Sequence, residues 1–285
     1  MNPYFDLFPM LGLPDAARAI AFRTLEVPFY TDTPFDGYGF VPALVPLWAT
    51  DSPAYTGYWK HWFTPLRQPV FVEVALESGA KAEEIARSFE QMAQRLVFTA
   101  IIMEETPTPA VQAFAAAVGL GPAEVETLAA LHKTSPNKTG PSEALLLSLP
   151  AFAADPPLCC LSPDAAQYRG DFPHDSMVLT EQAVRRLCTF EVSDTLCRRI
   201  RTLPFAPPWF TQTDQRAVFD RLLQEGDLSG AWLSLNSTGW RYLDAKDALG
   251  RLADRAEKPD FSLLASAWIA EPHEKTSLSP ESAAY

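Results

Sequence analysis

The segment YTGYWKHWF, Tyr55 to Phe63, contains the one histidine of this sequence that lies inside a strong pattern of apolar residues. An imidazole can act as a general base or bind a metal ion, because its charge changes near neutral pH. Neither role has a partner at the required spacing, since His61 belongs to no HExxH or HxH motif and has no carboxylate at metal-ligand spacing. We therefore expect His61 to be a packed or surface histidine.

The cysteines and the usual nucleophile motifs give no catalytic or metal site either. Cys159 and Cys160 are adjacent and Cys188 and Cys197 are nine residues apart, so none forms the CxxC pair of a zinc site. No GxSxG elbow, GxxxxGK[ST] loop or GxGxxG turn occurs in the chain. The sequence predicts no catalytic residue, no cofactor, no metal and thiols that stay reduced. An enzyme whose site is assembled from residues distant in sequence stays open as an alternative.

One segment could belong to a DNA-binding protein. In AAAVGLGPAEVETL, residues 115–128, small, glycine and apolar residues occur at the spacing of two helices that meet in a helix-turn-helix. The second helix offers Glu124 and Glu126 but no Arg, Lys, Asn or Gln before Lys133, so donors for bases and phosphates are missing. A plain helical hairpin is the expectation, and a DNA-binding regulator is an alternative.

The charge balance favours a basic protein partner. The chain of 285 residues has 35 acidic and 23 basic side chains and a net charge of −12, which repels phosphates and anionic lipids and attracts cations. The same charge is also compatible with solubility alone. One region is locally basic, but acids interleave it, so we expect a solvated, self-paired helix face. Its residues are Arg185, Arg186, Arg198, Arg199 and Arg201.

The sequence shows neither a membrane-spanning segment nor a signal peptide. No apolar run approaches the roughly 18 residues of a membrane helix. The N-terminal stretch MNPYFDLFPMLGLPDAARA lacks the basic region of a signal peptide. We expect a cytoplasmic protein that contacts neither membrane nor nucleic acid.

A small antiparallel sheet must position the aromatic segment. FVPALVPLW, Phe40 to Trp48, contains two prolines and suits an edge strand or an irregular extended segment. Alternation along residues 55–63 places Tyr55, Trp59 and Phe63 on one face, which we expect to be core. PVFVEVAL, Pro69 to Leu76, is a second strand, joined to the first through the short TPLRQ.

Helices are expected after this sheet. The apolar spacing predicts a helix from Ala82 to about Ile102, with two glutamates in its first turn and the sheet's apolar face beneath it. Caps, prolines and glycines predict further helices that begin near Pro109, Pro122, Thr213, Ser229, Tyr242 and Asp260. KTSPNKTGPS, Lys133 to Ser142, is polar and rich in turn formers, so we place a domain boundary there.

The expected fold class is thus α+β. A small antiparallel sheet packed by helices occupies residues 1–134, and a mainly helical region occupies residues 143–270. The polar residues 271–285 are expected to form a disordered tail.

The second face of the aromatic strand carries side chains that suit a protein interface. Tyr58 and Trp62 flank Lys60 on this face, and Asp51 lies nearby in sequence. Either a further element covers the two aromatic rings, or they are partner-binding anchors of the kind enriched in hot spots. We predict Asp51, Tyr58, Lys60 and Trp62 as partner-binding residues.

The order of features from Val45 to Val97 resembles the SUKH superfamily, whose many bacterial members are immunity proteins that bind and neutralise toxins. The resemblance lies in VPLWATDSPAYTGYW, in the strand PVFVEVALESG and in EEIARSFEQMAQRLV. It implies an α+β domain without catalytic residues that occludes a toxin in competition between bacteria. A cytoplasmic toxin that acts on nucleic acids or nucleotides needs a positive groove, so an acidic inhibitor would be steered to it.

Overall fold

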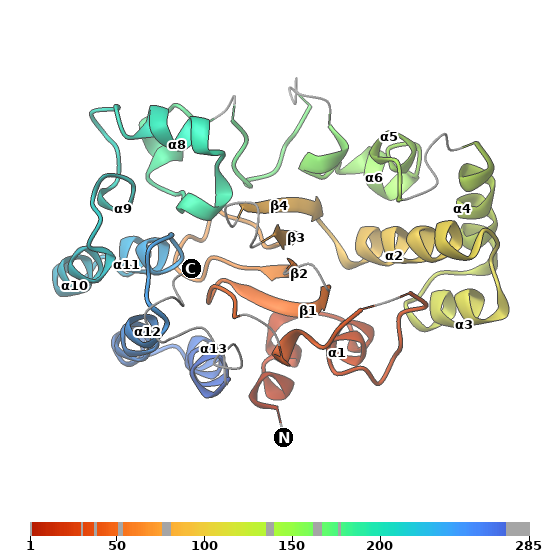
Figure 1. The fold of residues 1–285 in the computed structure, drawn as a ribbon, viewed down its shortest axis with the longest axis horizontal. Helices are drawn as coiled ribbons and strands as arrows, with labels where there is room; N and C mark the ends of the chain where they lie inside the picture. Colours follow the sequence, from red (N-terminus) through yellow and green to blue (C-terminus); the bar gives the residue numbers. More distant parts are fainter. Residues whose placement is uncertain are drawn as a thin grey trace.

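A four-stranded antiparallel sheet in the N-terminal half is followed mostly by helices, which confirms the α+β class (Figure 1). The computed structural model describes residues 2–29, 31–36, 39–50, 54–75, 81–134, 140–161, 167–175 and 178–271. The strands pair in chain order: β1 (Leu44–Thr50), β2 (Ala54–Trp59), β3 (Val70–Ala75) and β4 (Lys81–Ala86).

The predicted alternation is confirmed within β2 and β3, but β2 ends at Trp59, so Phe63, predicted for the same face, lies beyond the strand and is half-buried. Tyr55 and Trp59 of β2 lie on the same face as Val70, Val72 and Val74 of β3, and all five are at most 2% exposed. β1 is an edge strand, as predicted from the prolines of residues 40–48; Pro46 lies within it, and its register is irregular between Pro46 and Trp48. The aromatic ladder therefore forms core, as expected from its spacing.

Close approach of the first two strands depends on one glycine. A Cβ atom added at Gly57 of β2 would lie 2.5 Å from the carbonyl oxygen of Val45 in β1. No larger residue fits there unless the strands move apart.

The expected helix from Ala82 is wrong over its first turns, because residues 81–86 form β4. In KAEEIA, burial alternates as in a strand from exposed Lys81 to buried Glu84, and the last two residues, Ile85 and Ala86, are both buried. The two glutamates expected in a first helical turn therefore lie on opposite faces of a strand. Pairing with β3 satisfies the backbone of β4 and overrides the helix propensity of Ala, Glu and Lys.

The helix that follows begins where its cap residue stands. α2 (Phe89–Glu104) starts after Ser88, whose hydroxyl accepts a hydrogen bond from the Gln91 backbone N–H at 3.2 Å. The Gln91 side chain accepts in turn from the Arg87 N–H at 2.7 Å. The first bond satisfies a donor that the helix start leaves free, and the second holds the residue before the cap.

α3, α4 and α10 to α13 begin close to the expected positions, whereas α1 and α5 to α9 are not among the expected helices. The helix near Thr213 is capped by Asp214, whose carboxylate accepts from the Ala217 N–H at 3.0 Å. The helices are α1 (Asp15–Ala21), α3 (Pro109–Ala117), α4 (Pro122–Thr134), α5 (Glu143–Leu146), α6 (Pro150–Ala154), α7 (Glu181–Val184), α8 (Asp194–Ile200), α9 (Pro208–Thr211), α10 (Gln215–Glu225), α11 (Leu228–Leu235), α12 (Tyr242–Ala256) and α13 (Pro259–Ala270). Short 3₁₀ helices are η1 (Pro3–Asp6), η2 (Phe8–Leu11), η3 (Pro34–Asp36), η4 (Leu158–Cys160) and η5 (Thr189–Glu191).

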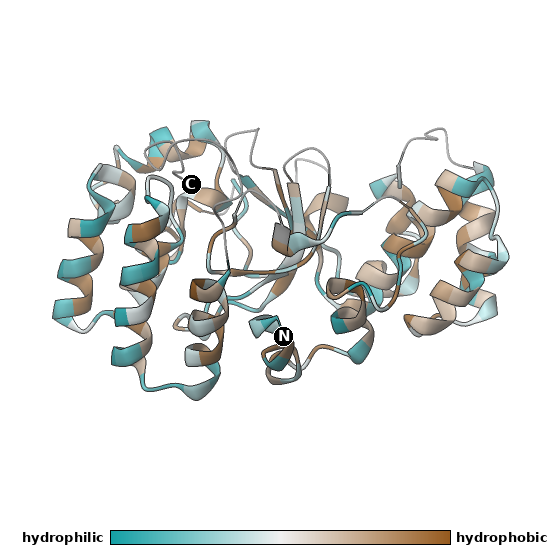
Figure 2. Cartoon of the chain, turned by 60° about the horizontal axis from the view of Figure 1, so that its bottom comes forward, coloured by the Kyte–Doolittle hydropathy of each residue, from teal (hydrophilic) through white to brown (hydrophobic). Residues whose placement is uncertain are grey.

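The helices form groups at the two ends of the sheet. α2 does not lie across the buried face of the sheet; it continues away from the end of β4 and packs against α3, α4 and α6 (Figure 1). α10 to α13 form the opposite end, with hydrophilic residues outward and apolar residues where the helices face one another (Figure 2). Near Tyr55 the buried face is covered instead by Phe40, whose ring centroid is 5.4 Å away.

The C-terminal helices pack back onto the N-terminal segment. Trp268 of α13 donates its indole N–H to the Phe40 carbonyl at 2.8 Å, and Asn236 accepts from the Ala43 N–H at 2.7 Å. One buried apolar cluster contains residues from both sides of the expected domain boundary. Residues 135–139 of that boundary and residues 272–285 of the expected tail lie outside the described part of the chain, whereas Glu271 is buried.

Candidate functional site

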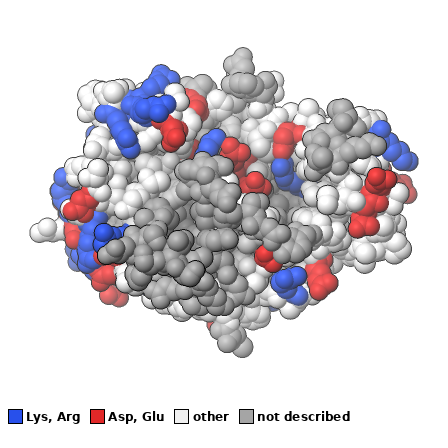
Figure 3. Space-filling view, in the orientation of Figure 1, with Lys and Arg blue, Asp and Glu red and all other residues white. Residues whose placement is uncertain are grey.

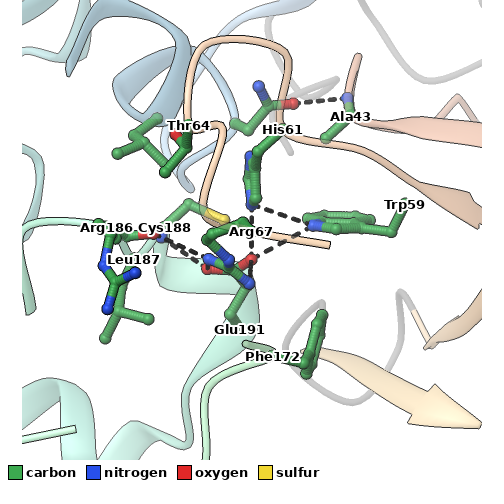
Figure 4. Close-up of polar contacts among 12 residues, drawn as sticks. Ala43, Trp59, His61, Thr64, Arg67, Phe172, Arg186, Leu187, Cys188 and Glu191 are labelled. Atoms are coloured by element: carbon green, nitrogen blue, oxygen red, sulfur yellow. Dashed lines mark hydrogen bonds and ion pairs between the residues drawn. The ribbon is translucent and has the colours of Figure 1, made fainter. Parts of the chain in front are cut away.

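A buried polar cluster joins the residues after β2 to the C-terminal half (Figure 4). His61 Nδ1 accepts a hydrogen bond from Trp232 Nε1 of α11 at 3.0 Å, and His61 Nε2 lies 2.6 Å from Glu191 Oε1 of η5. An indole N–H can only donate, so the network assigns the imidazole proton to Nε2, which donates to Glu191. Trp59 Nε1 then donates to the same carboxylate oxygen at 3.2 Å.

Arg67 completes this cluster as the counter-ion of Glu191. Its Nη2 and Nη1 lie 2.7 and 2.8 Å from the two oxygens of Glu191, which is a bidentate ion pair. The Cys188 N–H donates to Glu191 Oε2 at 3.0 Å, and Arg67 also donates to the Arg186 carbonyl at 2.8 Å. The side chains of Arg67 and Glu191 are 4% and 0% exposed, so both charges are desolvated.

The electrostatics of the cluster fix one protonation state. Burial by itself raises the pKa of Glu191, but the charge of Arg67 and the bonds from His61 and Arg67 outweigh it and hold the pKa well below its usual range. Burial lowers the pKa of His61 against the attraction of Glu191, so the imidazole is neutral at pH 7. The expectation of a packed histidine is confirmed. The cluster clamps three segments together, and protein donors already occupy its carboxylate.

A second buried carboxylate lies on β4. Glu84 accepts hydrogen bonds from the Tyr168 hydroxyl and from the Leu158 N–H, the latter at 3.1 Å. Arg87 Nη1 lies 3.8 Å from Glu84 Oε1 and Arg87 Nε lies 2.7 Å from Asp155 Oδ1. Burial raises the pKa of Glu84 to about 7, although the donors and Arg87 oppose this rise.

A cavity of about 360 Å³ has Glu84 and Glu191 among its lining residues, although both side chains are 0% exposed. It lies between β4 and residues 158–161, 172–175 and 191. Its lining residues are Lys81, Ala82, Glu83, Glu84, Leu158, Cys159, Leu161, Phe172, Pro173, His174, Asp175 and Glu191. The volume suits a small polar ligand. The Glu84 carboxyl group, with its pKa near 7, is 0% exposed, and protein donors engage both of its oxygens. The residues come from four separate stretches of the chain, so no local motif signals them in the sequence.

The predicted partner-binding residues divide between two places. Asp51 lies outside the described residues. Tyr58 lies on the second face of the sheet, half-buried, with its ring 5.4 Å from that of Phe71 in β3. Burial raises the pKa of Tyr58 to about 12, so its hydroxyl stays protonated at neutral pH.

Lys60 and Trp62 are brought together at the start of α13. The Lys60 ammonium lies 3.7 Å from the centre of the Trp62 ring, and that ring packs edge-on against Phe261 of α13 at 5.7 Å. Trp62 is 8% exposed. Of the two possibilities open for this ring, cover by a further element is the one that occurs, and Trp62 is not an exposed anchor.

The second face of the sheet carries two acidic residues that lie opposite each other because of the register between their strands, which their spacing in the sequence does not predict. Glu73 of β3 and Glu83 of β4 are directly opposite each other in the strand register, and both are exposed. Lys81 Nζ lies 2.8 Å from Glu83 Oε1. Phe71 and Glu73 are two residues apart on one strand, so Tyr58 and the two glutamates share this face.

Charged side chains are distributed unevenly over the visible surface. Figure 3 shows Lys and Arg gathered over α8 and acids over the end formed by α3 and α4. The basic region is partly self-paired, as expected, because Arg185 Nη2 lies 2.9 Å from Glu181 Oε1. α3 and α4 do form a packed helical hairpin. Glu124 of α4 accepts from the Gly121 N–H at 2.8 Å, so this side chain caps its own helix.

No protein-family model, curated protein or solved structure matches this chain. Every helix in the described ranges falls short of the length and apolar character needed to cross a bilayer.

Proposed function

We propose that this chain is an immunity protein that binds a basic toxin in the cytoplasm and neutralises it by covering its working surface. The observation that carries the proposal is the acidic face formed by Glu73, Glu83 and the ring of Tyr58. The net charge of −12 and the SUKH-like order of features between Val45 and Val97 support it.

The acidic face is unfavourable for the isolated protein. Like charges directly opposite each other on neighbouring strands destabilise a sheet by up to about 1 kcal/mol. Lys81 offsets part of the repulsion at Glu83. A partner that presents Lys or Arg to Glu73 and Glu83 would remove the rest of this repulsion. The free energy that the repulsion costs the isolated protein would then contribute to binding.

Tyr58 gives the same face an apolar element. Its ring rests on Phe71 and is already held in place, so little side-chain freedom is lost when a partner covers it. Aromatic side chains at such positions are frequent anchors in interfaces. The proposed contact surface is therefore a rigid sheet face with one aromatic ring and two acids.

The test uses the product of the neighbouring gene as the candidate toxin. Its affinity for the wild-type chain is measured at low and at physiological salt, and again for the double variant Glu73→Gln with Glu83→Gln. We expect the double variant to bind at least about 10-fold more weakly, mainly at low salt, while its stability is unchanged or higher.

The matched control removes two exposed acids at the end of α2, Glu104→Gln with Glu105→Gln, and so changes the net charge equally. This control should bind almost as well as the wild type. Equal losses in both double variants would mean that only net charge matters, and no binding at low salt would end the proposal.

One observation favours an enzyme as the second candidate. Glu84, with a pKa of about 7, lines the 360 Å³ cavity together with His174 and Asp175, which suits a general acid or base. Against this role, the Glu84 side chain is 0% exposed and donors engage both its oxygens. Turnover of a small substrate that disappears in Glu84→Gln would support the enzyme. If the Glu84→Gln variant loses turnover but still binds the toxin, enzyme activity and toxin binding are separate functions.

A further inference from the structure

Two thiols and a carboxylate converge beside the cavity, away from the acidic face. Cys159 and Cys160 belong to η4 and Glu143 to α5. The two sulfur atoms are 3.7 Å apart, and Glu143 Oε2 lies 3.3 Å from Cys159 Sγ and 3.2 Å from Cys160 Sγ. All three donor atoms lie within 4.8 Å of one another.

We propose that Cys159, Cys160 and Glu143 form a binding site for a thiophilic divalent metal ion, with zinc as the best fit. A tetrahedral zinc ion bonds sulfur at about 2.3 Å and carboxylate oxygen at about 2.0 Å, which places two sulfurs about 3.8 Å apart and a sulfur and an oxygen about 3.5 Å apart. The donor triangle therefore needs to move by only a few tenths of an ångström. Three protein ligands leave the fourth position to water or to a ligand.

Arg95 of α2 orients the carboxylate and balances the charge of the site. Its Nη2 and Nη1 lie 2.7 and 2.9 Å from the two oxygens of Glu143, and Nη1 lies 3.8 Å from Cys159 Sγ. Two thiolates and one carboxylate carry three negative charges, which a divalent ion and one guanidinium neutralise. Outer-shell partners of this kind hold ligands in position and raise metal affinity.

The site is open on one side. Cys160 is buried, but Cys159 is half-buried and lines the 360 Å³ cavity, and the Glu143 side chain is 32% exposed. An ion can therefore enter from solvent, and the protons of the two thiols leave to water as the metal–sulfur bonds form. The sequence gives no metal motif because the cysteines are adjacent and the third ligand lies 16 residues before Cys159.

The proposal is tested by Co²⁺ titration of the reduced full-length chain, with Zn²⁺ as competitor. We expect one Co²⁺ per chain, an intense near-ultraviolet thiolate-to-cobalt band, and displacement of Co²⁺ by Zn²⁺. The double variant Cys159→Ser with Cys160→Ser should lose the band. Glu143→Gln should keep the band, because both thiolates remain, but should bind Co²⁺ more weakly. Loss of an outer-shell partner typically costs roughly 10- to 100-fold in affinity, and loss of a direct ligand should cost at least as much.

Two cysteine variants serve as matched controls. Cys197→Ser changes a half-buried thiol of α8, and Cys188→Ser changes the thiol of the His61–Glu191 cluster. Both should keep the cobalt band. Circular dichroism and the metal-free Tm establish that each variant folds, and Zn²⁺ should raise the Tm of the wild type but not of the Cys159/Cys160 double variant.

Absence of the cobalt band in the wild type would overturn the proposal. A band that survives in the folded Cys159/Cys160 double variant would do the same. The outcome is independent of toxin binding, because none of the three ligands belongs to the acidic face.

Discussion

Replacement of Glu191 by glutamine tests the central energetic claim about this fold. The carboxylate receives hydrogen bonds from Arg67, His61, Trp59 and the Cys188 N–H. Glutamine has nearly the same size, but it presents an NH₂ group to some of these donors and leaves the guanidinium of Arg67, which is 4% exposed, without a counter-ion.

The expected loss is large for so small a change. Removal of one partner of a buried ion pair destabilises a protein by about 3–5 kcal/mol, because the remaining charge stays desolvated. Total unfolding free energies are about 5–15 kcal/mol, so the variant loses at least about a fifth of its stability. At about 2–4 °C per kcal/mol for chains of similar length, the Tm should fall by about 6–20 °C.

Urea unfolding followed by tryptophan fluorescence is the appropriate assay. Trp59 and Trp232 both donate hydrogen bonds into the cluster, so their emission reports its loss. The control is Glu181→Gln, which breaks the exposed pair with Arg185 and should cost less than about 1 kcal/mol. A Glu191→Gln variant within about 1 kcal/mol of the wild type would refute the account of the cluster as a desolvated clamp.

Three further predictions concern pH, a buried amide and a close strand contact. Burial raises the pKa of Glu84 from its ordinary 4.5 to about 7, so the folded state binds this proton more tightly than the unfolded state does. The bound proton contributes about 3 kcal/mol to the free energy of unfolding at low pH, and this contribution is lost as the pH rises from about 4.5 to 7. His61, whose pKa is lowered from 6.5, has the opposite effect, because stability is lost as pH falls below that value. The stability lost between pH 5 and pH 8 should therefore be smaller in Glu84→Gln than in the wild type. If the urea midpoint shifts between pH 5 and pH 8 by the same amount in both proteins, the pKa assigned to Glu84 is wrong. Asn236→Ala should cost about 1–3 kcal/mol in the same assay, because it leaves the buried N–H before β1 without its acceptor at 2.7 Å; a loss below about 0.5 kcal/mol would contradict this role. Gly57→Ala should cost about 1–3 kcal/mol, since its new methyl group would lie 2.5 Å from a carbonyl oxygen of β1. By contrast, Gly250→Ala in α12 meets its nearest atom at 3.7 Å and should stabilise the helix by up to about 1 kcal/mol; similar effects at both glycines would show that the strand contact is not tight.

Local patterns were sufficient for most secondary structure. The alternation around Trp59, the prolines of the edge strand and the glycine at the end of α10 act over a few residues, so their consequences follow from the sequence. β4 is the exception. Its residues, KAEEIA, favour a helix by themselves, and only the free edge of β3 makes them a strand.

The acidic face could be predicted only in part from local sequence. Alternation places Tyr58 and Glu73 on the second face of their strands. The alignment of Glu73 with Glu83 depends on the register of a strand that the local pattern does not predict. A one-residue change of register would move Glu83 to the buried face.

By itself the sequence determined the α+β class, the core face of β2 and β3 and the positions of most helices, because periodicity and capping are local interactions. Only the tertiary structure decided which charges are buried. Glu191 meets Arg67 across 124 residues and Glu84 meets Tyr168 across 84. A carboxylate leaves water only when the completed fold supplies its counter-ion and donors, so neither site exists until segments distant in the chain have come together.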